Sequence, residues 1–334
     1  MMRGLALRLL ALGWAFPPWA APSAAHALDL TQYPEVGAFI GEMSERHGFD
    51  AAQLRRLFLA ARIRPEIVEA MERPGEARPW YEYKGRFLDE EHVRDGRRYW
   101  ERHAQALERA RESYGVDPEI VVAIIGVETQ YGRNRGKYPV VDALATLMLH
   151  YPQRSEFFRR ELEEFLLLCR ENGFDPATLK GSYAGAIGAP QFLPSSYRRY
   201  AVDFDADGRR DLLDSPADVI GSVAHFLKAH GWEARAPVTD EVRLEGTLYF
   251  WIEKLGTRPA LPVSRLIQYG VVPRRPAELE RRAALIVLEG EDGPIHRLGY
   301  NNFYVITRYN RSALYAMAVY ELGELIRKRR AEPS

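Results

Sequence analysis

Apolar residues recur at helical spacing along most of the chain. Between residues 29 and 70 this spacing predicts short amphipathic helices, and Gly48 separates two of them. One later helix, over residues 155–170, is expected to close at Asn172-Gly173. The same spacing predicts helices at residues 89–114, 139–149, 215–230 and 312–327.

The most apolar of the expected helices runs from Asp117 to Gly132. Asp117 and Pro118 are typical of a helix start, and Gly132 is typical of a helix end. Its interior carries one ionisable group, Glu128, which should have a raised pKa or face a cleft. Either outcome suits a general acid. The β-branched residues 121–127 would also fit a buried strand, and a lone buried Glu can be structural, so the pattern leaves these alternatives open.

Strand-like patterns replace the helical one over residues 233–299. Residues 242–251 and 283–289 have the composition of strands and are bounded by proline and glycine, so a small β-rich unit is expected. Residues 73–79 also interrupt the helical pattern. The aromatic cluster 80–83 follows, and we expect it on an extended segment, where its rings could stack on sugars or cap the core.

Composition excludes some classes of function. Lys+Arg and Asp+Glu both number 46, so the formal net charge of +0 gives no overall attraction to nucleic acid or anionic membranes. The single cysteine, Cys169, lies in an apolar run and is expected to be a core residue. With one cysteine and no clustered histidine pair, neither an internal disulfide nor a structural zinc site is expected.

The first 27 residues have the pattern of a secretory signal peptide. Arg3 precedes an apolar run at residues 4–12, and an Ala-x-Ala cleavage site ends at Ala27, so the mature chain would begin at Leu28. The apolar run is too short for a membrane-spanning helix. No cysteine stands directly after the cleavage site to carry a lipid. We therefore expect an exported, soluble protein without stable membrane insertion.

Residues 180–197 are rich in glycine and alanine, which would let the backbone approach a ligand closely. They do not form a phosphate-binding loop, because the lysine precedes the glycines and no Gly-Lys-Ser/Thr sequence occurs. Ser182 and Gln191 offer neutral hydrogen bonds, which suit an uncharged polar ligand such as a saccharide. Tight helix packing would use the same small residues, so both interpretations stay open.

Residues 203–211 match the opening of a calcium-binding loop, and a solvated acidic turn is the alternative. A divalent cation would relieve the repulsion between clustered carboxylates, about 1 kcal/mol per pair in water at ~4 Å. The closing ligand is either Asp214, at the usual twelfth position, or Asp218, which could instead complete a helix cap. The other ligands expected from the pattern are Asp203, Asp205, Asp207 and the carbonyl of Arg209.

Several long motifs in the same order make the chain resemble the lytic murein transglycosylase B family, periplasmic enzymes of Gram-negative bacteria. The resemblance covers most of the mature chain and implies a lysozyme-like core with a helical domain and a small β domain around a glycan groove. It rests on residues 127–132, 181–197, 201–204, 220–224 and 302–310.

The resemblance also implies roles for single residues. Glu128 falls on the family's single catalytic Glu, and the acidic loop falls on its calcium loop, with Asp218 as the probable closing ligand. Two positions depart from the family. Gln153 stands where the family often has a second Arg, and Phe226 stands where it usually has a groove Tyr. The positions that match its glycan-contacting residues are Tyr83, Arg154, Ser182, Gln191, Tyr309, Asn310 and Tyr315.

The reaction implied by the family is a non-hydrolytic cleavage of peptidoglycan between N-acetylmuramic acid and N-acetylglucosamine. Glu128 would act first as acid and then as base, leaving a 1,6-anhydro end. Ordinary glycoside hydrolases use two carboxylates, and the motifs contain one acid in the apolar helix. A hydrolytic muramidase and a catalytically silent peptidoglycan-binding protein are the alternatives.

Pattern and resemblance together predict a mainly helical α+β protein with five parts. The signal peptide, residues 1–27, precedes an N-terminal helical region. The catalytic core with the calcium loop follows, then the β insertion, and the C-terminal segment completes the core. The expected boundaries are 28–114, 115–232, 233–299 and 300–334.

Overall fold

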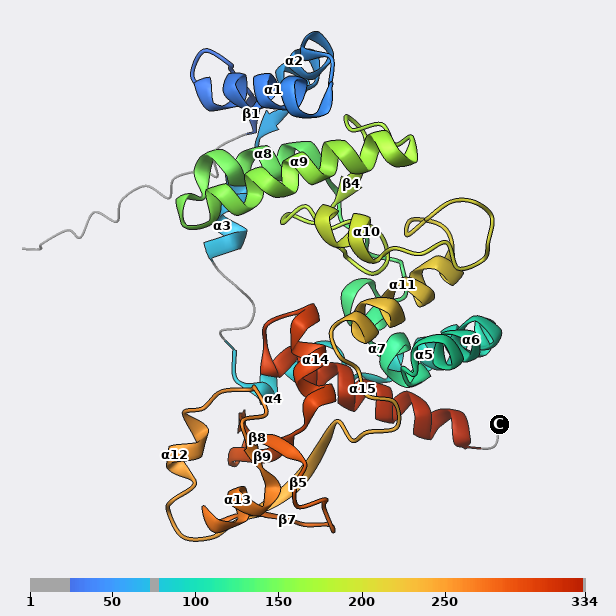
Figure 1. The fold of residues 1–334 in the computed structure, drawn as a ribbon, viewed down its shortest axis with the longest axis vertical. Coiled ribbons are helices and arrows are strands. Elements are labelled where there is room, and N and C mark those ends of the chain that lie inside the picture. Colours follow the sequence, from blue (N-terminus) through green and yellow to red (C-terminus); the bar gives the residue numbers. More distant parts are fainter. Residues whose placement is uncertain (1–24, 73–77, 333–334) are drawn as a thin grey trace, which may run out of the picture.

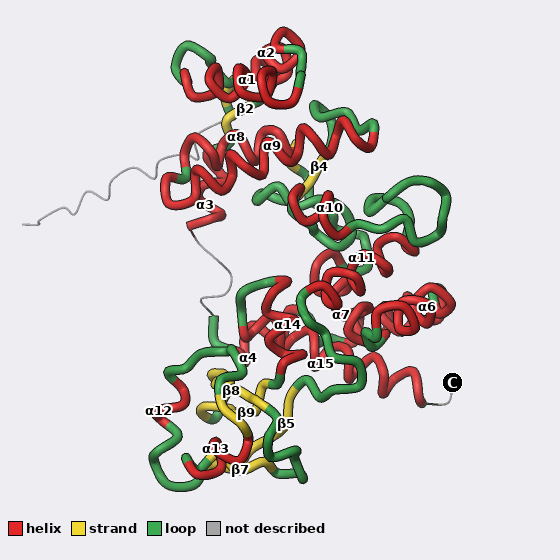
Figure 2. The backbone as a smooth tube through the Cα atoms, viewed as in Figure 1, coloured by secondary structure: helices red, strands yellow, loops and turns green. Residues whose placement is uncertain are grey.

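The computed structural model describes residues 25–72 and 78–332. Most of it is helical, with a small antiparallel sheet at one end, as the expected α+β class requires (Figures 1 and 2). Most of the expected signal peptide lies outside the described residues. Its last two, His26–Ala27, form strand β1, which pairs with β2 (Arg62–Ile63). No helix in the described ranges is long and apolar enough to cross a membrane.

The N-terminal helices confirm the sequence pattern. They are α1 (Pro34–His47), α2 (Ala51–Ala60) and α3 (Pro65–Glu72). Gly48 ends α1 in the left-handed conformation, with φ of 67°. Asp50 then starts α2, because its side chain accepts two backbone N–H bonds of 2.7 and 3.0 Å.

The middle of the molecule, between α1 and the sheet, is helical (Figure 1). The C-terminal helix α15 and helix α5 pack against α7, while α8 packs on α9 and α11 packs on α6. The single helix expected at residues 89–114 is divided at His103, where φ is −114°. The helices of this part are α5 (Glu90–Arg102), α6 (Ala104–Tyr114), α7 (Pro118–Thr129), α8 (Val140–His150), α9 (Ser155–Asn172), α10 (Pro194–Tyr200), α11 (Pro216–Ala229), α14 (Asn301–Tyr309) and α15 (Ala313–Ala331).

Contacts tie α5 and α6 to this middle group. Both helices pack on α7, and α5 also packs on α15. The boundary expected at residue 114 would instead group them with the N-terminal helices. Buried residues of α5 and α6 such as Trp100 and Leu107 belong to the same large core cluster as α7, and this cluster also includes residues of the N-terminal helices such as Phe39.

The aromatic cluster 80–83 is helical and not extended, contrary to the sequence expectation. It forms the short helix α4 (Trp80–Tyr83), which continues into a 3-10 turn at Lys84–Arg86. Trp80 and Tyr83 are buried, so these rings cap the core. The one exposed ring of the three is Tyr81.

A five-stranded antiparallel sheet with its own apolar core forms the β unit, in the strand order β6-β8-β9-β5-β7. The expected strand 242–251 is half wrong, because β5 ends at Leu244 and the turn at Gly246, with φ of 65°, leads into helix α12. The elements of the β unit are β5 (Thr239–Leu244), α12 (Phe250–Glu253), β6 (Leu261–Pro262), α13 (Val263–Gln268), β7 (Val271–Pro273), β8 (Arg282–Gly290) and β9 (Gly293–Gly299).

Candidate active site

Helix α7 ends earlier than the sequence suggested, and its end fixes Glu128. The expected cap, Gly132, lies beyond the helix, because Gln130 and Tyr131 already adopt the left-handed conformation with φ of 49° and 61°. The turn folds the Tyr131 ring back against Gly126, where a Cβ would lie 2.6 Å from the tyrosine hydroxyl. At this end of the helix, Thr129 donates a 2.7 Å hydrogen bond to the carbonyl of Ala189.

Glu128 has both properties expected of a carboxylate in apolar surroundings. It lines a cleft, and burial raises its pKa to about 7. The hydroxyl of Tyr315 donates a 2.7 Å hydrogen bond to Glu128 Oε1, which acts against that rise. Ser312 caps α15 and places Tyr315 one turn into the helix. The C-terminal helix thus supplies the polar partner of the buried acid.

The cleft has a volume of about 950 Å³ and brings together five of the seven predicted glycan contacts. Glu128 is the one carboxylate among its lining residues in the described chain. Tyr83 and Tyr315 are buried and lie outside the lining; Tyr83 packs on Phe87 at 5.3 Å between ring centroids. The predicted residues that line the cleft are Arg154, Ser182, Gln191, Tyr309 and Asn310.

Ser182 offers a hydrogen-bond donor to the cleft, and Gln191 offers an acceptor. The Oγ of Ser182 accepts from the backbone nitrogens of Ala184 and Ala186 at 3.3 and 3.1 Å, so its hydroxyl hydrogen remains to be donated. The Gln191 amide nitrogen donates to the carbonyls of Arg135 and Gly188 at 3.2 and 3.0 Å. The group that this side chain offers a ligand is therefore its carbonyl oxygen.

The glycines of residues 180–197 serve packing within the protein. A Cβ at Gly185, where φ is 81°, would lie 2.5 Å from Leu144 Cδ2, and one at Gly188 would lie 2.4 Å from the Leu212 carbonyl. Strand β4 (Lys180–Gly181) pairs with β3 (Tyr138–Pro139). A Cβ at Gly181 would come equally close to a backbone carbonyl oxygen. The packing alternative therefore explains the glycines, while the polar side chains between them face the cleft.

An aromatic group forms one wall of the cleft. The Tyr309 ring stacks on Tyr315 at 6.3 Å and meets Phe226 edge-on at 4.8 Å. The Tyr309 hydroxyl donates a 2.6 Å hydrogen bond to the carbonyl of Pro190. Phe226, where the resemblance suggested Tyr, is almost fully buried and lacks a hydroxyl, so it contributes an apolar surface and no hydrogen bond.

Sequence reasoning missed several cleft residues, most of them cationic. Arg199 comes from α10, His230 from the end of α11, and Arg308 and Arg311 from α14 and the loop after it. They lie far apart along the chain, and each occupies a polar position that looks like an ordinary solvated one. No local signal in the sequence distinguishes them.

The acidic loop brings three of its predicted ligands together. Carboxylate oxygens of Asp203, Asp205 and Asp218 lie within 4.8 Å of one another. Asp214 instead pairs with Arg135 at 2.9 Å. The geometry thus favours Asp218 over Asp214 as the closing residue.

Asp207 and Arg209 lie outside that group of three carboxylates. The Asp207 carboxylate accepts the backbone N–H of Arg209 at 2.8 Å. Burial raises the pKa of Asp218, and the charge of Asp205 acts in the same direction, while two backbone N–H donors at 2.7 Å oppose the rise. Three close carboxylates, one of them buried, have the donor chemistry of a hard divalent cation.

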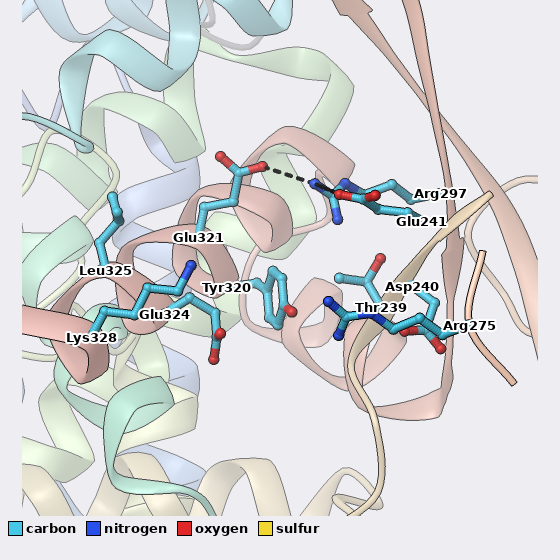
Figure 3. A pocket seen from close by; sticks show the side chains of 10 residues that line it. All are labelled: Thr239, Asp240, Glu241, Arg275, Arg297, Tyr320, Glu321, Glu324, Leu325 and Lys328. Atoms are coloured by element: carbon cyan, nitrogen blue, oxygen red, sulfur yellow. Dashed lines mark ion pairs between the residues drawn. The ribbon is translucent and has the colours of Figure 1, made fainter. Parts of the chain in front are cut away.

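A second cleft, of about 390 Å³, lies between β5 and α15 (Figure 3). Its lining carries four carboxylates and three cations, and Arg297 points between Glu241 and Glu321 at 3.9 and 3.8 Å. Thr239 lines it, and its buried hydroxyl lacks a hydrogen-bond partner among the described residues. None of the residues predicted from the sequence lies here, so the candidate chemistry belongs to the Glu128 cleft.

Comparison with known proteins identifies the family of the chain. Residues 31–324 match the family described as Transglycosylase SLT domain. The membrane-bound lytic murein transglycosylase B of Escherichia coli (strain K12) is 40% identical over 316 residues, 89% of this chain and 84% of its own.

Two solved structures show the same fold. Escherichia coli lytic transglycosylase Slt35, in complex with calcium, superposes with a TM-score of 0.83 at 41% identity, over 92% of this chain and 96% of its own. SltB3 from Pseudomonas aeruginosa, in complex with NAG-NAM-pentapeptide, gives 0.78 at 35%, over 88% and 79%. On the family match and these identities, the chain belongs to the SLT-domain transglycosylase family.

Proposed function

We propose that this protein is a lytic transglycosylase that cuts the MurNAc-GlcNAc β-1,4 bond of peptidoglycan without water and leaves 1,6-anhydroMurNAc ends. Glu128 carries the proposal. It is the single carboxylate among the lining residues of the cleft in the described chain, and burial holds its pKa at about 7. A group with this pKa can both give and take a proton near neutral pH.

In the proposed reaction Glu128 first donates its proton to the glycosidic oxygen as the bond to the muramic acid breaks. The carboxylate then takes the proton of the 6-hydroxyl of the same sugar, whose oxygen closes the anhydro ring. Each proton given is recovered, so one carboxyl group completes the cycle. Tyr315, held 2.7 Å from Glu128, orients the carboxyl group and stabilises its charged form between the two steps.

The neutral lining of the cleft suits the sugar part of the substrate. Ser182 donates, the carbonyl oxygen of Gln191 accepts, and Tyr309 offers an aromatic surface on which a pyranose ring can stack. Arg154 and Asn310 add polar groups at the same cleft. SltB3 was solved with a glycan that bears a pentapeptide, and we propose that the substrate of this chain also carries peptides.

For the acidic loop we propose a structural calcium site. Asp203, Asp205 and Asp218 would hold the ion through carboxylate oxygens, and Asp207 and the Arg209 carbonyl belong to the same motif. Slt35, which shares the fold, was solved as a calcium complex. The ion would neutralise the close carboxylates and tie the loop to the start of α11, where Asp218 lies.

We also propose that the protein acts in the periplasm after export by the signal peptide at residues 1–27. Its substrate lies there, and the basic, apolar and Ala-x-Ala segments occur in the order that export requires. Cleavage before Leu28 would remove the two residues of β1 and leave α1 and the rest of the chain intact. N-terminal sequencing of the protein from a periplasmic extract tests this placement.

Mass analysis of digested peptidoglycan tests the reaction. A transglycosylase releases anhydro-muropeptides, which are one water lighter than hydrolysed ones, so products with only reducing ends would establish a hydrolytic muramidase. Glu128→Gln keeps the size of the side chain and removes its proton chemistry. The expected loss is about 10²- to 10⁴-fold in turnover, with binding retained. Binding without turnover in the wild type would indicate a catalytically silent protein.

A further inference from the structure

The Glu128 cleft is strongly cationic, unlike the second cleft, whose lining carries more carboxylates than cations. Its charged lining residues are Glu128 and four arginines. The glycan backbone of the proposed substrate is neutral, so its sugars do not require this charge. The excess of arginines therefore points to an additional, anionic part of the ligand.

None of the four arginines forms an ion pair with a carboxylate in the part of the chain that the structure describes. Arg154 instead lies over the Phe157 ring at 4.2 Å, which fixes its place on the wall. The next residue along from Arg199 shows the contrast, because Arg198 pairs with Glu164 and, at 2.7 Å, with Glu171. Some arginines of the described chain outside the cleft have such partners and others do not, whereas all four that line the cleft lack one.

Two of the four lie near one histidine. Arg199, on α10, and Arg308, on α14, both lie close enough to His230 to lower its pKa, although burial lowers it more. His230 lies 2.8 Å from the Phe226 carbonyl through Nδ1, and a hydrogen bond from Nδ1 would hold the ring in place. The lowered pKa keeps the ring neutral near pH 7. Two exposed guanidinium groups thus lie near an uncharged ring in the lining of the cleft.

We propose that Arg199 and Arg308 bind free carboxylates of the peptide attached to the glycan, an inference that rests on the proposed function. A guanidinium presents paired N–H donors that match a carboxylate. Every peptide with a free C-terminus carries at least one such group, whereas the sugar hydroxyls carry none. The pair would therefore distinguish peptide-bearing glycan from bare glycan.

Binding to two matched ligands tests the proposal. One is a GlcNAc-MurNAc tetrasaccharide carrying peptides, and the other is the same tetrasaccharide without peptides, with its lactyl carboxylates capped as methylamides so that they carry no charge. Both are titrated calorimetrically into Glu128→Gln protein, which does not cut them. Arg199→Gln or Arg308→Gln should weaken binding of the peptide-bearing ligand about tenfold. Binding of the bare ligand should not change.

Control variants separate recognition from folding. Arg55→Gln removes an exposed arginine on α2 that makes no ion pair in the described chain, and it should change neither affinity. Arg308→Lys keeps the charge but not the paired donors, so it should recover only part of the affinity lost in Arg308→Gln. Amidation of the peptide carboxylates should weaken binding as much as removal of the peptide does when Arg199 and Arg308 are both unchanged in the Glu128→Gln protein.

The possible outcomes are distinct. An equal loss for both ligands would assign the arginines to the glycan and overturn the proposal, and so would no loss for either. The proposed function has its own readout, the anhydro product released by the wild-type protein. If that product is absent while the arginine variants still discriminate between the ligands, the reaction is wrong and the recognition stands.

Discussion

The hydrogen bond from Tyr315 to Glu128 should set the upper pH limit of activity. Glu128 must begin the reaction protonated, so the rate should fall as pH rises through its pKa of about 7. Burial raises this pKa and the Tyr315 hydroxyl lowers it, because a hydrogen bond to the carboxylate favours the charged form. Tyr315→Phe removes the opposing effect and leaves the burial.

The size of the shift follows from the bond. A hydrogen bond to a charged group contributes about 1.5–3 kcal/mol, and one pKa unit corresponds to about 1.4 kcal/mol. Tyr315→Phe should therefore raise the pKa of Glu128 by about one to two units. The falling limb of kcat/KM would move from near pH 7 to about pH 8–9.

The assay is a pH profile of kcat/KM, measured as anhydro-muropeptide released from purified peptidoglycan. Tyr309→Phe is the matched control, because its hydroxyl donates to the Pro190 carbonyl at 2.6 Å and not to Glu128. The falling limb of this control should stay near pH 7. An unmoved limb in Tyr315→Phe, with the fold intact by circular dichroism, would refute the reasoning.

Three further changes have measurable outcomes. Removing divalent cations with a chelator should lower Tm and added calcium should restore it; Asp218→Asn should abolish this response and Asp214→Asn should keep it. The pKa of Glu128 in the folded protein lies above its ordinary value of 4.5, so the wild-type protein loses stability as pH rises from about 4.5 through 7. Glu128→Gln removes this loss. It should therefore raise the free energy of unfolding, measured by urea titration, by about 3 kcal/mol at pH 8 and by little at pH 4. Gly185→Ala should destabilise the fold by about 1–3 kcal/mol in the same titration, since its Cβ would overlap Leu144.

Helix ends were predictable from the sequence where one residue type dictates the backbone. Gly48 and Gly173 end their helices in the left-handed conformation, as their positions after amphipathic runs predicted. At α7 the prediction of Gly132 was wrong, because a tertiary contact decided the end. The Tyr131 ring packs on Gly126, and this contact favours a turn that begins two residues before the glycine.

Within the site, the helix around Glu128 could be found in the sequence, because a single acidic residue stands out in an otherwise apolar run. The resemblance supplied the other contacts, and the fold brings most of them to one cleft. The cations at its edge could not be found in this way. Arg199 and Arg308 are single polar residues on different helices, and their common position depends on how α10 and α14 pack.

The acid and the hydroxyl that tunes it lie 187 positions apart, at the end of α7 and near the start of the last helix. A ribosome makes α7 long before it makes α15, so the nascent chain contains an acid without its partner. Until α15 docks on α7, Glu128 lacks both the hydrogen bond from Tyr315 and the packing of the last helix. The power to cut a load-bearing polymer thus belongs to the finished chain alone, and a product clipped before residue 312 should be harmless to the wall.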